Sequence, residues 1–224
     1  MKLKAKHVVF LIIAVMSIYV MFHNERFVID SEHPAWQRYE AFKWWLLPHA
    51  VFGTIVLVFA PFQFSDRLRQ RFTKAHRVMG RLYVVGALGL APLGAYIQYF
   101  QERSGAPRSF TILAIVDAAL LMGTTLLAGL FAFRRKIAVH RQWAARSYSV
   151  ALVFITGRFV MGVTGWEALG VEIVQAIIWS CLVLAVPMAD VALNWKDLLA
   201  SFSRTVKPAI PAKPPIPERV PRAA

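Results

Sequence analysis

Long apolar stretches alternate with short polar ones along this chain. Six of the apolar stretches approach the length of about 20 residues with which a helix crosses the hydrocarbon core of a bilayer. They predict transmembrane helices over residues 8–22, 44–62, 78–100, 110–133, 143–165 and 171–193. The pattern therefore predicts an all-α integral membrane protein with six transmembrane helices, in a single domain over residues 1–200.

The first stretch and the end of the chain differ from the rest. Residues 8–22 are a short apolar run that follows Lys2, Lys4 and Lys6, as in a secretory signal. No small-residue cleavage site comes after it, so an uncleaved signal anchor is favoured over a removed peptide. Residues 201–224 are rich in proline and alanine without a hydrophobic period, which predicts a disordered or polyproline tail that is either inert or docks a partner.

The charge of the chain indicates an orientation in the membrane. The sequence is 58% hydrophobic and carries a formal net charge of +14. Basic residues of membrane proteins crowd the cytoplasmic loops, so this charge indicates contact with a lipid bilayer and not with nucleic acid. Lysine and arginine gather between the second and third predicted helices, between the fourth and fifth, and in the tail. Both termini are therefore predicted to be cytoplasmic.

Ionisable residues inside the predicted spans are His49, Asp117 and Arg158 and, near the span ends, Arg81, Arg146 and Asp190. Charge there is costly and is usually functional or paired. Asp117 lies seven residues from the outer end of its span, about 10 Å deep, and Arg158 lies eight residues before Trp166, about 12 Å deep. Because Asp117 and Arg158 lie at similar depths, we expect them to form an ion pair. His49 would lie slightly shallower in the same leaflet. This polar cluster is either a structural buried pair or a binding or proton-handling site.

A weak repeat relates the middle spans. His49 precedes His76 by 27 residues and Asp117 precedes His140 by 23, and each hairpin has a basic inner loop that ends in His-Arg. Two similar hairpins predict that spans two to five form a four-helix core. His76 and His140 would then lie at one inner depth, on helix faces lined with small residues.

Two histidines at one depth on different helices suit a b-type haem. Imidazole nitrogens can supply both axial ligands to the haem iron, and guanidinium groups can neutralise the propionates. His76 and His140 are the candidate ligands, although a His-Arg pair at the membrane interface is also typical of a lipid-headgroup contact. The candidate propionate partners are Arg77, Arg81, Arg141 and Arg146.

Several motifs resemble those of a known family. The stretch Ala60-Pro61-Phe62-Gln63-Phe64, then His76-Arg77, then His140-Arg141-Gln142-Trp143 resemble the predicted bacterial membrane proteins grouped as domain of unknown function 2306. The resemblance covers roughly residues 49–158. It implies a multi-pass protein of the bacterial inner membrane and supplies no activity.

The chain is more distantly similar to the six-span, two-haem transmembrane cytochromes b. In that family spans two to five each give one histidine, the second span pairing with the fourth and the third with the fifth. His49, His76 and His140 match three of these positions, whereas the fourth span carries Asp117. The resemblance implies one inner haem, on His76 and His140, and no outer haem of that kind.

Three functional hypotheses follow from these residues. The first is an electron carrier, a component of a transmembrane oxidoreductase, with one b haem and an outer site for a quinol or small reductant at His49, Asp117 and Arg158. The second is a proton-coupled transporter whose path passes the same three residues. The third is an accessory subunit of a larger membrane complex. No soluble-enzyme motif is present.

Overall fold

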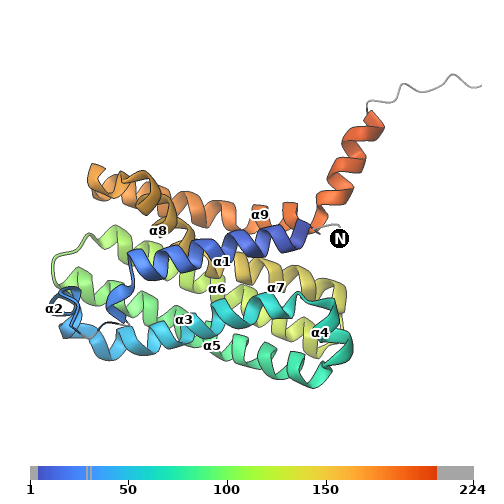
Figure 1. Cartoon of the computed structure of the whole chain (residues 1–224), viewed down its shortest axis with the longest axis horizontal. Coiled ribbons are helices and arrows are strands. Elements are labelled where there is room, and N and C mark those ends of the chain that lie inside the picture. Colours follow the sequence, from blue (N-terminus) through green and yellow to red (C-terminus); the bar gives the residue numbers. More distant parts are fainter. Residues whose placement is uncertain (1–4, 29, 31, 206–224) are drawn as a thin grey trace, which may run out of the picture. The chain divides into compact units, whose positions relative to one another are not determined.

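The computed structural model of the chain describes residues 5–28, 30 and 32–205, which are helical almost throughout and include no strand. This confirms the predicted all-α class. The chain divides into two compact units, Met1–Leu193 and Asn194–Ala224. The α-helices, shown in Figure 1, are α1 (Ala5–His23), α2 (Ala35–Tyr39), α3 (Lys43–Gln63), α4 (Asp66–Arg71), α5 (Thr73–Arg103), α6 (Arg108–Phe133), α7 (Ile137–Ala151), α8 (Val153–Thr164) and α9 (Val171–Thr205).

Four of the described helices are long and apolar enough to cross a membrane. A fifth span is present if α7 and α8 are counted together, whereas the apolar stretch of α1, His7–His23, is shorter. The multi-pass membrane character is therefore confirmed, and the number of six spans stays a prediction. The four segments are Glu40–Gln63, Thr73–Arg103, Arg108–Phe133 and Val171–Ser201.

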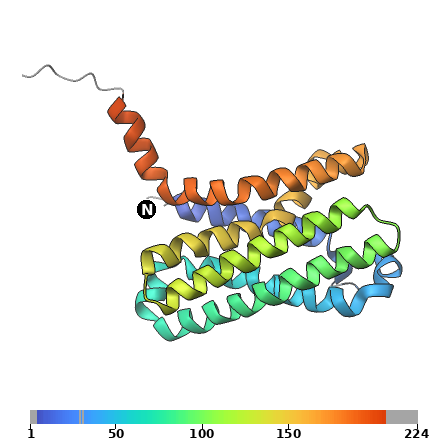
Figure 2. The ribbon, with the colours of Figure 1, turned by 180° about the vertical axis from the view of Figure 1, so that it is seen from behind.

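The middle helices pack in chain order, as hairpins do. Helix α3 lies along α5, α5 along α6, and α6 along α7. In Figure 2, α6 lies antiparallel to its neighbours α5 and α7, so α5 and α7 run in the same direction. Their shared core holds fully buried apolar side chains, among them Val56, Ala87, Leu113 and Val150. Outside this core, α1 lies along α8.

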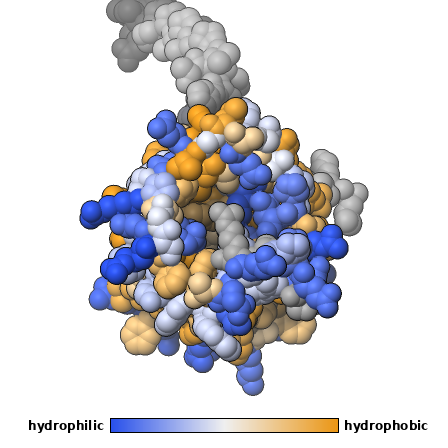
Figure 3. Space-filling model, turned by 90° about the vertical axis from the view of Figure 1, so that its left-hand side faces the viewer, coloured by the Kyte–Doolittle hydropathy of each residue, from blue (hydrophilic) through white to orange (hydrophobic). Residues whose placement is uncertain are grey.

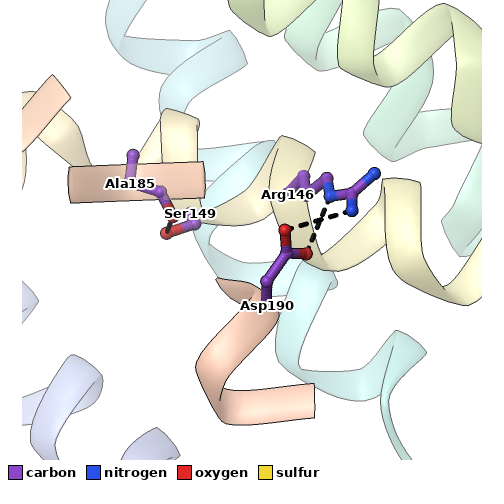
Figure 4. Close-up of polar contacts among 4 residues, drawn as sticks. All are labelled: Arg146, Ser149, Ala185 and Asp190. Carbon is purple, nitrogen blue, oxygen red and sulfur yellow. Dashed lines mark hydrogen bonds and ion pairs between the residues drawn. The ribbon is translucent and has the colours of Figure 1, made fainter. Parts of the chain in front are cut away.

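The fifth predicted span is broken and not continuous. In place of one helix over 143–165, α7 ends at Ala151 and α8 begins at Val153, with a bend of 41° between them. The two halves make different tertiary contacts. Helix α7 is tied to α9, because the Ser149 hydroxyl donates a hydrogen bond to the carbonyl of Ala185 at 2.6 Å (Figure 4). Helix α8 packs on α1 and also approaches α9, where Gly157 lies beside Ile178.

The structure also moves three predicted boundaries. Helix α5 begins at Thr73 and α7 at Ile137, five or six residues before the predicted starts, so His76 and His140 are each the fourth residue of a helix and lie in its first turn. Helix α9 continues through residues 201–205, which we expected to be disordered. The remainder of the predicted tail, residues 206–224, lies outside the described residues.

The surface of the first unit separates polar ends from apolar sides. Figure 3 looks onto the end that carries α2 and the α5–α6 connection, where many hydrophilic residues gather. Arg103 and Arg108, on either side of the α5–α6 connection, are exposed. Along the helices, in contrast, the exposed side chains include Val85 and Leu126. An apolar flank between polar ends is what contact with a bilayer requires.

Candidate functional site

A cavity of about 370 Å³ lies where the middle helices meet the segment that follows α1. His49, Asp117 and Arg158, the predicted intramembrane cluster, all line it, together with Glu25. We refer to this space as the His49 cavity. Apolar side chains make up much of the rest of its wall, including Leu46, Ala50, Leu57, Leu121 and Ile155. An apolar wall with a few converging polar groups is typical of a small-molecule site.

The imidazole of His49 is fixed by α5. Its Nδ1 lies 3.1 Å from the carbonyl oxygen of Leu90. Because a carbonyl can only accept, Nδ1 carries the proton of this bond, and Nε2 of the neutral ring is left as an acceptor. Gly94 makes room for the ring, since a Cβ built there would lie 3.0 Å from Cε1 of His49. The histidine thus presents one hydrogen-bond acceptor whose direction α5 determines.

Asp117 brings a carboxylate into the same cavity. Its side chain comes from the middle of α6, and the residue is only 8% exposed. The oxygen Oδ1 is buried and has no hydrogen-bond partner within the part of the chain that the structure describes. An unpaired carboxylate oxygen at membrane depth is costly, so it needs a donor that the fold itself does not provide.

Arg158 does not form the ion pair that we expected. Its guanidinium group pairs with Glu25 and not with Asp117. The reason is the packing of α1 along α8, which carries the residue just after α1 to the side of Arg158. Comparing depths within the predicted spans could not find this partner, because Glu25 lies outside them. The cation that lines the His49 cavity is therefore already neutralised.

His76 and His140 share one level of the bundle. The hydroxyl of Tyr83 lies 2.8 Å from that of Ser147, which in turn lies 2.7 Å from the hydroxyl of Thr125. Tyr83 follows His76 by seven residues, and Ser147 follows His140 by seven. Helices α5 and α7 run in the same direction, and the Tyr83–Ser147 hydrogen bond joins them at one level. Each histidine lies two turns, about 10 Å, before this level on its own helix, so both histidines lie at one level on the facing sides of the two helices.

The ring nitrogens of this pair differ in their bonding. Nδ1 of His140 lies 2.8 Å from the carbonyl oxygen of Ala128 in α6, which orients the ring and leaves Nε2 available. Nδ1 of His76 is buried and has no hydrogen-bond partner among the described residues. We refer to His76 and His140 as the histidine pair. The described residues contain no group of three or more His, Cys, Asp or Glu side chains that could hold a metal ion.

The four candidate arginines are not equivalent. Arg146 donates to both carboxylate oxygens of Asp190, with distances of 2.8 Å from Nε and 3.1 Å from Nη2 (Figure 4). Its guanidinium also lies over the ring of Trp143, 4.7 Å from the centroid. This group is occupied and links α7 to α9. The other three, Arg77, Arg81 and Arg141, are exposed.

Sequence reasoning missed two residues of these sites, Glu25 and Tyr83. Glu25 lies three residues after the apolar stretch 8–22, and a carboxylate so close to that stretch could have indicated an interior contact. Tyr83 lies in phase with His76, two turns along the same helix face. That phase was a usable sign too, because a buried tyrosine hydroxyl usually finds a partner.

Comparison with known proteins identifies one family. The model of the family described as Predicted membrane protein (DUF2306) matches residues 46–193. The match runs from α3 into α9 and includes the histidine pair and the three predicted residues of the His49 cavity, whereas Glu25 lies outside it. No curated protein and no solved structure matches the chain. The resemblance to domain of unknown function 2306 is confirmed, and that to the transmembrane cytochromes b stays a prediction.

Proposed function

We propose, from the premise that this chain belongs to the DUF2306 family of predicted membrane proteins, that it is a transmembrane electron carrier. In this proposal His76 and His140 bind one b haem, and the His49 cavity admits the electron donor, a quinol or small reductant. The observation that carries the proposal is the shared level and facing of the histidine pair, which follows from the hydrogen bond between Tyr83 and Ser147.

The bonding around the pair supports this role. Neutral imidazoles are the axial ligands of many b haems. The contact from His140 to the carbonyl of Ala128 is of the kind that orients a metal-ligating ring, and His76 has an unpaired buried nitrogen. Gly80 and Ala144 each follow their histidine by one turn, and Gly80 faces the side chain of Gln63 at the end of α3.

The arginines of the basic loops would hold the propionates. Arg77, Arg81 and Arg141 are exposed and close in sequence to the histidine pair, whereas Arg146 is excluded because Asp190 occupies it. We also propose six spans with α1 as the first, a single membrane domain over residues 1–200, and an inner-membrane location with both termini on the cytoplasmic side. The lysine and arginine distribution supports that orientation.

A visible absorption spectrum tests the proposal. Protein purified from haem-replete cells should show b-type bands in the reduced-minus-oxidised spectrum. His76→Ala and His140→Ala should each abolish the bands, whereas the matched control His49→Ala should keep them. All variants should elute as the wild type does from a sizing column, which separates ligand loss from misfolding. A wild-type protein without haem bands would contradict the proposal.

A second candidate function, a proton-coupled transporter, is favoured by the break between α7 and α8. Irregular backbone at membrane depth is tolerated where it lines a cavity, and Ala151 and Phe154, on either side of the break, line the His49 cavity. This function requires water to reach Asp117. A cysteine at Thr54 in a Cys181→Ala background should then react with a water-soluble thiol reagent in proteoliposomes, and protection under all conditions would exclude a transport path there.

A further inference from the structure

We infer that the His49 cavity is a binding site for a neutral hydroquinone, whose two hydroxyl groups donate hydrogen bonds to His49 and Asp117. This deepens the proposed function, on which it rests, by naming the chemical class of the electron donor. It concerns binding alone. The two acceptors come from different helices, α3 and α6, on the wall of one cavity.

The hydrogen-bonding capacity of the cavity determines the ligand's polar groups. Nδ1 of His49 is engaged by the carbonyl of Leu90, so Nε2 of the neutral ring can only accept. Oδ1 of Asp117 is buried and lacks a donor. With Asp117 ionised, a ligand that hydrogen-bonds both Nε2 of His49 and the carboxylate of Asp117 must offer two donors. A hydroquinone carries one hydroxyl donor on each side of its ring, whereas the corresponding quinone carries none.

The charge of the cavity excludes an anionic ligand. Arg158 is the cation among the described lining residues, and Glu25 already pairs with it. An added anion would face the carboxylate of Asp117 without a free counter-charge. Donors on a neutral molecule can instead satisfy Asp117 without bringing a charge into the membrane, where charges are costly.

The size and lining of the cavity suit an aromatic ring. A volume of about 370 Å³ is in the range of small-molecule sites. Phe42 and Phe154 line the space, and aromatic faces pack favourably against a flat ring. His49 and Asp117 come from helices long and apolar enough to cross a bilayer, so the position of the cavity favours a lipid-soluble ligand.

Binding of duroquinol to the full chain in detergent tests this inference. Under anaerobic, reducing conditions duroquinol should bind saturably, as measured by isothermal titration calorimetry. Its dimethyl ether, which has the same ring and no donors, should bind at least tenfold more weakly. Asp117→Ala and His49→Ala should each weaken duroquinol binding by about tenfold or more.

The matched control is Thr124→Val in α6, two turns from Asp117. Its hydroxyl donates to the carbonyl of Leu120 within the same helix, and the residue does not line the cavity. This variant should bind duroquinol as the wild type does. Each variant must also keep its sizing-column profile and melting temperature, so that lost binding is not mistaken for lost folding.

Three results would overturn the inference. They are equal binding of duroquinol and its dimethyl ether, unchanged affinity in both cavity variants, and displacement of duroquinol by the cation benzylammonium at lower concentration than duroquinol itself requires. The last would identify an organic-cation site on Asp117. Recording the reduced-minus-oxidised spectrum of the same wild-type sample separates the two proposals, because saturable duroquinol binding by a wild-type protein without haem bands would refute the haem and leave the hydroquinone site standing.

Discussion

Replacing Gly94 with alanine should disturb the His49 cavity through one added methyl group. A Cβ at this position would lie 3.0 Å from Cε1 and 3.5 Å from Nδ1 of His49. Carbon atoms pack best at about 3.5–4.0 Å, so the ring must shift. The shift acts on the bond from Nδ1 to the carbonyl of Leu90, which is 3.1 Å long. The shift should weaken the contact between α3 and α5 and should turn Nε2 of His49 away from its present direction.

The magnitude follows from three contributions. Alanine gains about 0.5–1 kcal/mol over glycine inside a helix. Overpacking costs about 1–3 kcal/mol, and a distorted hydrogen bond costs about 1 kcal/mol. Together these contributions should make Gly94→Ala lower the free energy of unfolding by about 1–3 kcal/mol.

Gly123 in α6 offers the matched control. A Cβ there meets nothing within 4 Å, so Gly123→Ala keeps the helix gain without the clash. Denaturant titration of both variants in one detergent measures the difference, which should be about 2–4 kcal/mol because the helix gain cancels between them. Gly94→Ala should also weaken duroquinol binding, whereas Gly123→Ala should not. Equal stability of the two variants would refute the idea that α5 fixes the His49 ring.

Three further predictions concern the polar contacts between helices. A double-mutant cycle on Arg146→Ala and Asp190→Ala should give a coupling energy of about 1 kcal/mol. The value is modest because both side chains are partly exposed, at 22% and 38%. A coupling energy of zero would show that this ion pair does not stabilise the contact between α7 and α9. Tyr83→Phe should lower the free energy of unfolding by about 1 kcal/mol, because it removes the hydroxyl that bonds to Ser147. In a protein that already carries Ser147→Ala, adding Tyr83→Phe should cause no further loss of stability. Glu25→Gln should lower the melting temperature, because it removes the charge that pairs with Arg158. The double variant Glu25→Arg with Arg158→Glu, which exchanges the two charges, should recover part of the lost melting temperature. A double variant that melts no higher than Glu25→Gln would count against the ion pair.

The fold was predictable where it depends on local pattern. The apolar lengths of α3, α5, α6 and α9 follow from the sequence, because a bilayer requires a continuous apolar run whatever the neighbours are. The break after Ala151 was not predictable. The break accompanies contacts between distant segments, of α7 with α9 through Ser149 and Ala185 and of α8 with α1, and no periodicity within 143–165 records those contacts.

The candidate site divides in the same way. The rarity of ionisable groups in hydrocarbon was enough to single out His49, Asp117 and Arg158, and all three line one cavity. The choice of partners was not predictable from depth. Arg158 was expected to pair with Asp117 and pairs with Glu25, because partner choice depends on which helices touch and in which rotation. The same contact leaves the carboxylate of Asp117 unpaired, which is the basis of the hydroquinone inference.

One face of α5 connects the two sites. His76, Tyr83 and Leu90 follow at intervals of seven residues, and Gly94 lies five turns from His76 on the same side. The levels of the histidine pair and of His49 are therefore about 27 Å apart along this helix. Substitutions that far apart normally act independently. His76→Ala should thus leave hydroquinone affinity unchanged, and His49→Ala should leave the haem bands unchanged. A loss of both properties in either variant would mean that the helix face transmits a change between the sites, which rigid packing of α5 against α3 and α6 does not predict.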